Sequence, residues 1–434
     1  MVKRWIMAAL DHFAFTCLVS VLGAIVFLYG VAVGEYKCFP YTWLERTVHA
    51  VILSLEPNRP HHLTAAEYDF DGARVHDRDA ISPGVTLITG YWPESDWAPG
   101  IRVIDVDGNV LHAWDVDPSR IWPDSPHDDH TAGTKNVRGN YVHGTYLFPN
   151  GDVLLNIEYL GLVRMNAGGE VVWKLPLRTH HSITRDEDGN FWVCGTKWLE
   201  RRRADDRRRA EEYSLEVPVT EDFAVKVSPE GKVLREISLL DALHRSGQGE
   251  LLGEPPLTGD ILHTNDVEPL PTALADAFPA FNAGDLLISC REINTIFVLD
   301  PETERIKWLS RSGIQQHDPD FLPDGTIQVF DNRRPWYGGS RIFRIHPADG
   351  TIYVDYPHDP HTDFLTMAGG KAQRLPGGNL LITEARRGRV FEVDRDGRLV
   401  WEWVAPLYGD DLVPEVLEGT RYPLSPEQVT AWSQ

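Results

Sequence analysis

The sequence has few of the residues that mark several common classes of protein. It contains 4 cysteines and 4 methionines in 434 residues. So few cysteines exclude the class of small secreted proteins that a disulfide framework holds together. Lysine and arginine together number 42 against 64 aspartates and glutamates, which gives a formal net charge of -22. Because nucleic acid is itself anionic, this balance excludes it as the main partner.

Long hydrophobic runs are also scarce, and one is long enough to cross a membrane. Phe13 to Gly34 is an uncharged run of 22 residues, and at ~1.5 Å per residue such a helix spans the ~30 Å hydrocarbon core. Lys3 and Arg4 precede it, so the positive-inside rule places the N-terminus in the cytoplasm. We therefore expect a single-pass membrane protein whose main domain lies on the periplasmic or extracellular side. A cleaved signal peptide is the alternative reading, because Ala32-Val33-Gly34 resembles a cleavage site, and it exports the same domain.

Several catalytic motifs are missing. The chain has no GxSxG elbow, no Walker A sequence and no GxGxxG loop, which removes the usual signals for a serine hydrolase, a P-loop enzyme and a dinucleotide-binding domain. Two clusters of histidine and aspartate, HDDH at 127–130 and HDPHTD at 358–363, leave metal-dependent hydrolysis as an alternative. Neither cluster supplies a complete ligand set, so we expect no metal site and no cofactor.

A hairpin signature repeats along the chain. Apolar alternation, a turn of Asp, Asn or Pro usually with Gly, and a second alternating strand occur at 101–114, 162–175, 223–237, 296–309, 342–356 and 390–403. A second hairpin precedes five of them, at 147–155, 184–193, 267–288, 321–329 and 374–382. Two hairpins give four strands per repeat, and radial repetition protects sheet edges. The pattern predicts an all-β, six-bladed β-propeller that follows one N-terminal transmembrane helix.

These repeats divide the chain into four segments. We expect a membrane anchor at 1–36, a linker with an interfacial helix near Tyr41 to Leu55 at 37–83, the propeller at 84–406 and a tail at 407–434. The first blade lacks a full inner hairpin and offers only VTLITGYW at 85–92. A strand from the tail after Pro406, or from residues 60–84, is expected to close the ring. Cys194 and Cys290 fall one residue out of phase on neighbouring repeats, so we expect them on opposite faces and unbridged.

Histidines recur at one position of the inner hairpins. His143, His181 and His317 each lie eight residues before the turn glycine of their hairpin, and His263 lies two residues before the equivalent position. The innermost strands of a propeller line its central channel, so these imidazoles are expected to converge there. A single histidine at a strand start is more often structural, but four at related positions favour a functional site.

Polar residues recur at a second position, seven residues after the turn glycine of the inner hairpin, where the strand is otherwise rich in Leu, Ile and Ser in the case of Arg291. Arg291, Asn332 and Glu158 occupy equivalent places in three repeats. An arginine there is costly to bury unless it faces a cavity or an anion. These residues therefore extend the predicted channel site.

The chain resembles the arylsulfotransferase family of bacterial aryl-sulfate sulfotransferases, which are six-bladed propellers. The resemblance covers roughly residues 84–406 and rests on HTNDVEPLP (263–271) leading into LLISCRE, on QHDPDF (316–321) with FDN (330–332), on HHSITRDEDGNFWV (180–193) and on KAQRLPGGNLLITEARRGRVFEV (371–393). The QHDPDF and FDN pair is its most specific part. It implies sulfuryl transfer from an aryl sulfate to a phenolic acceptor without the nucleotide donor PAPS.

The resemblance also implies roles for individual residues. It makes His317 the nucleophile that forms a sulfohistidine, and it matches the family's histidine-arginine pair to His263 and Arg291 and its HH pair to His180 and His181. Together with the repeat positions, this gives His317, His263, Arg291 and His181 as the expected catalytic residues and His143, His180, Asn265 and Asn332 as the expected substrate-binding residues. A neutral imidazole can attack sulfur without a metal, and an arginine or protonated histidine can stabilise the transition-state charge. The implied partners are the aryl sulfate, the phenol and, through the N-terminal helix, the lipid bilayer.

A non-catalytic function is the alternative, because propellers host many functions. An anchored propeller could serve as a scaffold or accessory subunit of a membrane complex and would then have a protein partner. An open funnel with His317 and Arg291 in reach of one anion favours the enzyme, and a blocked histidine ring favours the scaffold.

Overall fold

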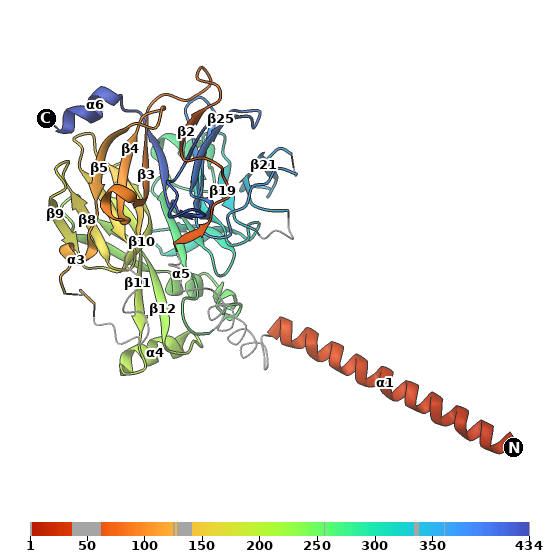
Figure 1. Ribbon diagram of the computed structural model, residues 1–434. Helices are drawn as coiled ribbons and strands as arrows, with labels where there is room; N and C mark the ends of the chain where they lie inside the picture. The colour runs from red at the N-terminus through yellow and green to blue at the C-terminus, as the bar shows by residue number, and fades with distance from the viewer. Residues whose placement is uncertain are drawn as a thin grey trace. The chain divides into compact units, whose positions relative to one another are not determined.

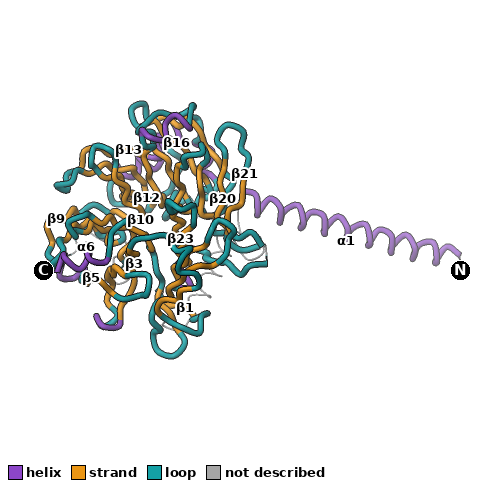
Figure 2. The backbone as a smooth tube through the Cα atoms, turned by 90° about the horizontal axis from the view of Figure 1, so that it is seen from above, coloured by secondary structure: helices purple, strands orange, loops and turns teal. Residues whose placement is uncertain are grey.

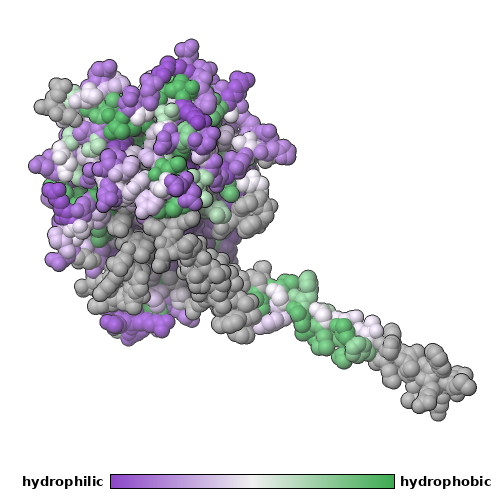
Figure 3. All heavy atoms as spheres, in the orientation of Figure 1, coloured by the Kyte–Doolittle hydropathy of each residue, from purple (hydrophilic) through white to green (hydrophobic). Residues whose placement is uncertain are grey.

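A computed structural model of the protein describes residues 2–36, 62–124, 126–127, 141–255, 257–333, 338–359 and 361–433. The chain divides into two compact units, residues 1–61 and 62–434. The first contains α1 (Val2–Tyr36; Figure 1), part of which is coloured as hydrophobic in Figure 3. Its apolar side chains Phe15, Ile25 and Phe27 are exposed. Within the described part of the chain, no helix meets the length and hydropathy needed for a membrane span. The helix expected near Tyr41 to Leu55 lies outside the described residues.

In its described residues, the second unit contains six β-sheets of four or five strands, which form the blades, and one two-stranded sheet; their strands appear in Figures 1 and 2. From the innermost strand outwards, the first three blades are β27 (Gly419–Tyr422), β3 (Val85–Trp92), β4 (Ala98–Ile104) and β5 (Val110–Asp115); β6 (Val142–Leu147), β7 (Val153–Ile157), β8 (Gly161–Met165) and β9 (Val171–Leu175); β10 (Thr179–Arg185), β11 (Phe191–Leu199), β12 (Val219–Val227) and β13 (Val233–Ser238). The other three are β14 (Thr264–Pro269), β15 (Leu286–Cys290), β16 (Thr295–Asp300) and β17 (Arg305–Ser310); β18 (His317–Phe321), β19 (Ile327–Asp331), β20 (Arg341–Ile345) and β21 (Ile352–Tyr356); β22 (Lys371–Arg374), β23 (Leu380–Glu384), β24 (Arg389–Val393), β25 (Leu399–Val404) and β2 (Gly72–Val75).

Short helices connect or cover these sheets. They are η1 (Pro93–Ser95), α3 (Pro118–Ile121), α4 (Ala204–Glu212), α5 (Leu239–Arg245), η2 (Gly249–Gly253), η3 (Thr272–Ala277), η5 (Ala385–Arg387), α6 (Pro426–Thr430) and η6 (Ala431–Ser433). A small separate pair joins β1 (Leu63–Ala65) to β26 (Leu412–Pro414).

The hairpin signature of the sequence matches the blades closely. All six outer hairpins form the third and fourth strands of a sheet, and the five inner hairpins form the first and second. The turn glycine of each inner hairpin has a positive φ, from +79° at Gly325 to +90° at Gly378. Only glycine adopts this conformation without strain, which explains its recurrence. The predicted six-bladed propeller is confirmed.

The C-terminal tail closes the ring. Its strand β27 pairs with β3 in the register Gly419↔Ile88 to Tyr422↔Val85, which supplies the inner strand that the first hairpin repeat lacks. From the N-terminal side, β2 pairs with β25 and adds a fifth, outermost strand to the last blade. The sheets therefore draw strands from both segments flanking 84–406.

The apolar core lies between the blades. Among the described residues, one buried cluster fills each of the six interfaces between neighbouring blades. Cys194 and Cys290 belong to the same cluster, between the third and fourth blades. As predicted, the two side chains leave their equivalent strands on opposite faces. They still meet, because one face of each blade packs against the opposite face of the next blade. Both thiols are free.

Candidate active site

Five histidines from four neighbouring blades converge at the channel, and we call them the histidine cluster: His143, His180, His181, His263 and His317. His181 lies at its centre, because its ring centroid is 3.9 Å from that of His143, 4.9 Å from His263 and 6.0 Å from His317. His180 is 5.0 Å from His181 and 6.3 Å from His263. The structure thus confirms that the repeated histidines converge.

Irregular strand pairing places these histidines. The innermost strands of the four histidine-bearing blades shift register at Val142/Thr145, His180/Ile183, Thr264/Asp266 and His317/Asp320. The innermost strands of the other two blades pair without a shift. Such bulges re-aim side chains and occur beside functional sites.

Backbone conformation at the cluster is strained. His181 and His263 have φ values of +55° and +48°, which are uncommon for residues other than glycine. Gly144 lets β6 approach β10 closely, because a Cβ at that position would lie 1.7 Å from the carbonyl oxygen of His181. Strain at two histidines of one cluster indicates that their positions matter more than local backbone preference.

Hydrogen bonds fix the tautomer of His317. Its Nδ1 lies 2.7 Å from Asn332 Oδ1 and 3.0 Å from the carbonyl oxygen of Gln315, both acceptors. The amide of Asn332 is itself oriented, since its Nδ2 donates to the carbonyl oxygens of Thr366 and Gly369. Nδ1 of His317 therefore carries the proton, and Nε2 keeps its lone pair. That Nε2 is buried and has no hydrogen-bond partner among the described residues.

Burial keeps the central imidazoles neutral. It lowers the pKa of His317 to about 3, and the positive charge of Arg291 acts in the same direction. Burial together with the charge of His263 lowers the pKa of His180 to about 3. The pKa of His181 falls well below its ordinary value for the same main reason. At neutral pH these rings have a free lone pair rather than a charge.

A second histidine is paired with a carboxylate. His263 Nδ1 donates to Asp260 Oδ2 at 2.6 Å, and the backbone N–H of His263 donates to Asp260 Oδ1 at 3.1 Å. Burial alone would raise the pKa of the Asp260 carboxyl, but His263 outweighs it and holds this pKa below the ordinary value. The Asp260 carboxylate therefore orients the ring of His263 and accepts from its Nδ1.

The other predicted residues, Arg291, Asn265 and Asn332, all contact other groups of the protein. Arg291 directly follows β15 instead of lying on the strand, and its guanidinium is paired with the neighbouring Glu292 at 2.6 Å. Asn265 Nδ2 donates to the carbonyl oxygen of Gln316, which leaves its buried Oδ1 without a partner among the described residues. An amide oxygen suits a hydroxyl donor better than a sulfuryl oxygen. Asn332 is fully buried and supports His317 rather than facing substrate.

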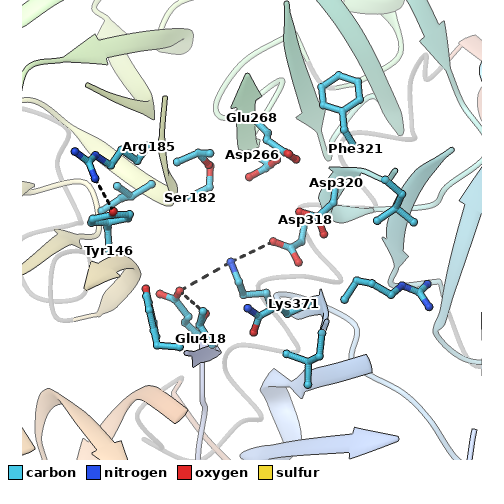
Figure 4. Close-up of a pocket in the computed structure, with 18 of the residues that line it drawn as sticks. Tyr146, Ser182, Arg185, Asp266, Glu268, Asp318, Asp320, Phe321, Lys371 and Glu418 are labelled. Atoms are coloured by element: carbon cyan, nitrogen blue, oxygen red, sulfur yellow. Dashed lines mark hydrogen bonds and ion pairs between the residues drawn. The ribbon is translucent and has the colours of Figure 1, made fainter. Parts of the chain in front are cut away.

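Beside the cluster, a cavity of about 760 Å³ occupies the channel (Figure 4). All six innermost strands line it, and its lining residues Gly144, Ser182 and Asp318 directly follow three of the clustered histidines. Four carboxyl groups face it from β14 and β18, and we call it the acidic cavity: Asp266, Glu268, Asp318 and Asp320. Lys371 Nζ lies 3.4 Å from Asp318 Oδ1 and 3.9 Å from Glu418 Oε1. Such a lining does not favour an anionic ligand.

The acidic cavity should make stability depend on pH. Burial and the charge of Asp318 raise the pKa of Asp266 to about 8, so the folded state holds one proton more than the unfolded chain between about pH 4 and pH 8. The stabilisation of the folded state by this proton is full below about pH 4. It is lost as the pH rises from about 4 to about 8, with a slope of at most about 1.4 kcal/mol per pH unit.

The Asp266→Asn variant should therefore show a smaller loss of unfolding free energy between pH 5 and pH 8 than the unmodified protein. Urea denaturation at several pH values measures this difference. An unchanged slope in the variant would contradict the raised pKa.

Sequence reasoning missed two parts of the site. Asp260 lies in a loop with no counterpart in the other repeats, and its only signal is its place three residues before His263. The register shifts in the innermost strands are the second part, and the alternation of apolar residues gives no sign of them. Tyr159 packs against His180 with a centroid distance of 4.8 Å.

A comparison with known proteins finds one matching family. A model of the arylsulfotransferase (ASST) family matches residues 144–405, more than half of the chain. No curated protein matches.

Solved structures show distant similarity. A protein of unknown function from Bacteroides caccae is 12% identical over 77% of this chain and 99% of its own, with a TM-score of 0.47. TolB from Acinetobacter baumannii is 11% identical over 78% of this chain and 67% of its own, with a TM-score of 0.45. Virginiamycin B lyase from Staphylococcus aureus is 13% identical over 68% and 88%, with a TM-score of 0.36. These distant likenesses carry no functional argument, and it is the family match that identifies the chain as a member of the arylsulfotransferase family.

Proposed function

We propose that the protein transfers a sulfuryl group from a phenolic sulfate to a phenolic acceptor through a sulfohistidine at His317. One observation carries the proposal: the buried Nε2 of His317 has a lone pair and no partner in the described part of the chain, while Asn332 holds the proton on Nδ1. A neutral, oriented imidazole is the form that acts as a nucleophile. Family membership supports the same substrate class.

In the first half of the reaction, Nε2 of His317 attacks the sulfur of the aryl sulfate. The N–S bond forms as the S–O bond to the aryl group breaks, and the phenolate leaves with the bonding electron pair. His263, oriented by Asp260, protonates that phenolate and becomes neutral. Arg291 adds positive charge near the site, although Glu292 already pairs with it.

In the second half, the hydroxyl oxygen of the acceptor phenol attacks the same sulfur. The N–S bond breaks, the electron pair returns to Nε2 of His317, and His263 takes the phenol proton. Both histidines then have the protonation states with which they started. The unpartnered Oδ1 of Asn265 suits the phenol hydroxyl, and His180, His181 and His143 line the same space.

Steady-state kinetics tests this route. With 4-nitrophenyl sulfate as donor and a second phenol as acceptor, release of nitrophenol should give the parallel double-reciprocal lines of ping-pong kinetics. Intersecting lines would show direct transfer within a ternary complex. Absence of release with several donors would favour the non-catalytic scaffold.

We also propose that Phe13 to Gly34 anchors the chain in a membrane, with the propeller on the periplasmic or extracellular side. The support is the uncharged run of 22 residues after Lys3 and Arg4 and the helical conformation of α1. Alkaline carbonate should leave the full chain in the membrane pellet and release a chain that lacks residues 1–36. External protease should cut the propeller in intact spheroplasts, and protection from it would contradict this orientation.

A further inference from the structure

Three side chains from two neighbouring blades form a group of metal-ligand size. His143 lies on β6, Glu158 directly follows β7, and His181 lies on β10. One ligand atom from each lies within 4.8 Å of the other two, and His143 Nδ1 is 3.8 Å from Glu158 Oε1. A tetrahedral zinc ion with bonds of about 2.1 Å holds its ligands about 3.4 Å apart, so small side-chain rotations reach that geometry.

The protein itself does not satisfy one of these atoms. Nδ1 of His143 is buried without a hydrogen-bond partner among the described residues, since 3.8 Å from Glu158 is too long for a hydrogen bond. A buried imidazole nitrogen left in this state costs free energy. An ion bound between His143 and Glu158 would satisfy that nitrogen.

The surroundings resemble those of metal-ligating histidines. His180 and His181 share a hydrogen bond between their Nδ1 atoms at 2.8 Å, which orients the ring of His181. Outer partners of this kind position ligands and tune their basicity. Gly144 and the bulge in β6 bring the two blades close enough for both histidines to meet.

We propose that His143, Glu158 and His181 bind one divalent transition-metal ion of the zinc type. Two imidazoles and one carboxylate suit such an ion, whereas Mg²⁺ and Ca²⁺ prefer oxygen ligands. Three protein ligands leave a fourth position open for water or a substrate oxygen. The His181 ring lies 6.0 Å from that of His317, so the ion faces the same space as the proposed nucleophile. Metal binding does not depend on the proposed sulfuryl transfer.

Calorimetric titration with Zn²⁺ tests this site. The full chain, tag-free in detergent and stripped with a chelator, should bind one ion, and Co²⁺ at the same site should give visible ligand-field absorption. The variants Glu158→Gln and His143→Gln should bind Zn²⁺ at least about tenfold more weakly. His346→Gln is the matched control, because His346 lies outside the histidine cluster on the turn after β20.

A further variant separates this proposal from the proposed function. His317→Ala lacks the proposed nucleophile but retains the three ligands, so it should bind Zn²⁺ like the unmodified protein. Equal Zn²⁺ affinity in the unmodified protein, Glu158→Gln and His143→Gln would overturn the metal site. Should either variant fold poorly, absence of a Zn²⁺-induced rise in the melting temperature of His317→Ala would overturn it as well.

Discussion

The His317→Ala variant should lose sulfuryl transfer, with nitrophenol release at least about a thousandfold slower than in the unmodified protein. The variant has no atom in place of the buried Nε2 of His317. The lone pair of that nitrogen is free because Asn332 accepts from Nδ1 on the same ring. His180 also has a buried Nε2 without a partner among the described residues, but its Nδ1 contacts a second imidazole and not an amide oxygen that fixes the tautomer. Initial rates at saturating donor measure the effect.

A histidine in the same blade provides the control for this experiment. His346 lies at the outer turn of the fifth blade and pairs only loosely with Asp349, at 3.4 Å. Its substitution by alanine should leave the rate unchanged. Activity in His317→Ala within tenfold of the unmodified protein, with normal folding, would show that another group accepts the sulfuryl group.

The Asn332→Leu variant should show the second largest effect, a fall in kcat of about 10- to 100-fold. Leucine cannot accept from Nδ1 of His317, so the imidazole loses its fixed tautomer. The carbonyl oxygen of Gly369 also loses the donor Nδ2, and that of Thr366 keeps only the Ser340 hydroxyl, around a fully buried position, which should lower the unfolding free energy by about 2 to 5 kcal/mol. Kinetic measurements and denaturant unfolding separate the two effects.

A conservative variant distinguishes orientation from mere structural support. Asn332→Asp keeps an oxygen that accepts from Nδ1 of His317, but the added negative charge favours the imidazolium and raises the pKa of His317 above about 3. The nucleophile should then become protonated as pH falls, and the rate of the first half-reaction should drop on the acid side. A pH profile identical to that of the unmodified protein would contradict the role given to Asn332.

The fold was largely predictable because each blade repeats one pattern. Alternating strands and a glycine at the turn, such as Gly189 or Gly325, indicate hairpins from local sequence alone. The closing strand β27 was harder to place. Its four residues Gly-Thr-Arg-Tyr show no clear alternation, and only their pairing with β3 makes them a strand. A long-range contact of this kind depends on ring closure, which no local signal reports.

The candidate site was predictable to the extent that it repeats. The position eight residues before the turn glycines found His143, His181 and His317, and the position seven residues after them found Arg291, Asn332 and Glu158. What each side chain does was not predictable. Arg291 pairs with its neighbour Glu292, Asn332 supports His317 from behind, and Glu158 lies with two histidines in the metal-sized group. These differences follow from bulges and contacts between blades rather than from spacing.

Intact-mass analysis of the protein after brief exposure to 4-nitrophenyl sulfate, without an acceptor phenol, tests the central claim most directly. The account predicts one adduct of about 80 Da per chain, located at neutral pH to the peptide 312–333 that contains His317, and absent from His317→Ala. Nitrophenol release without any adduct, or an adduct at a different residue, would contradict it.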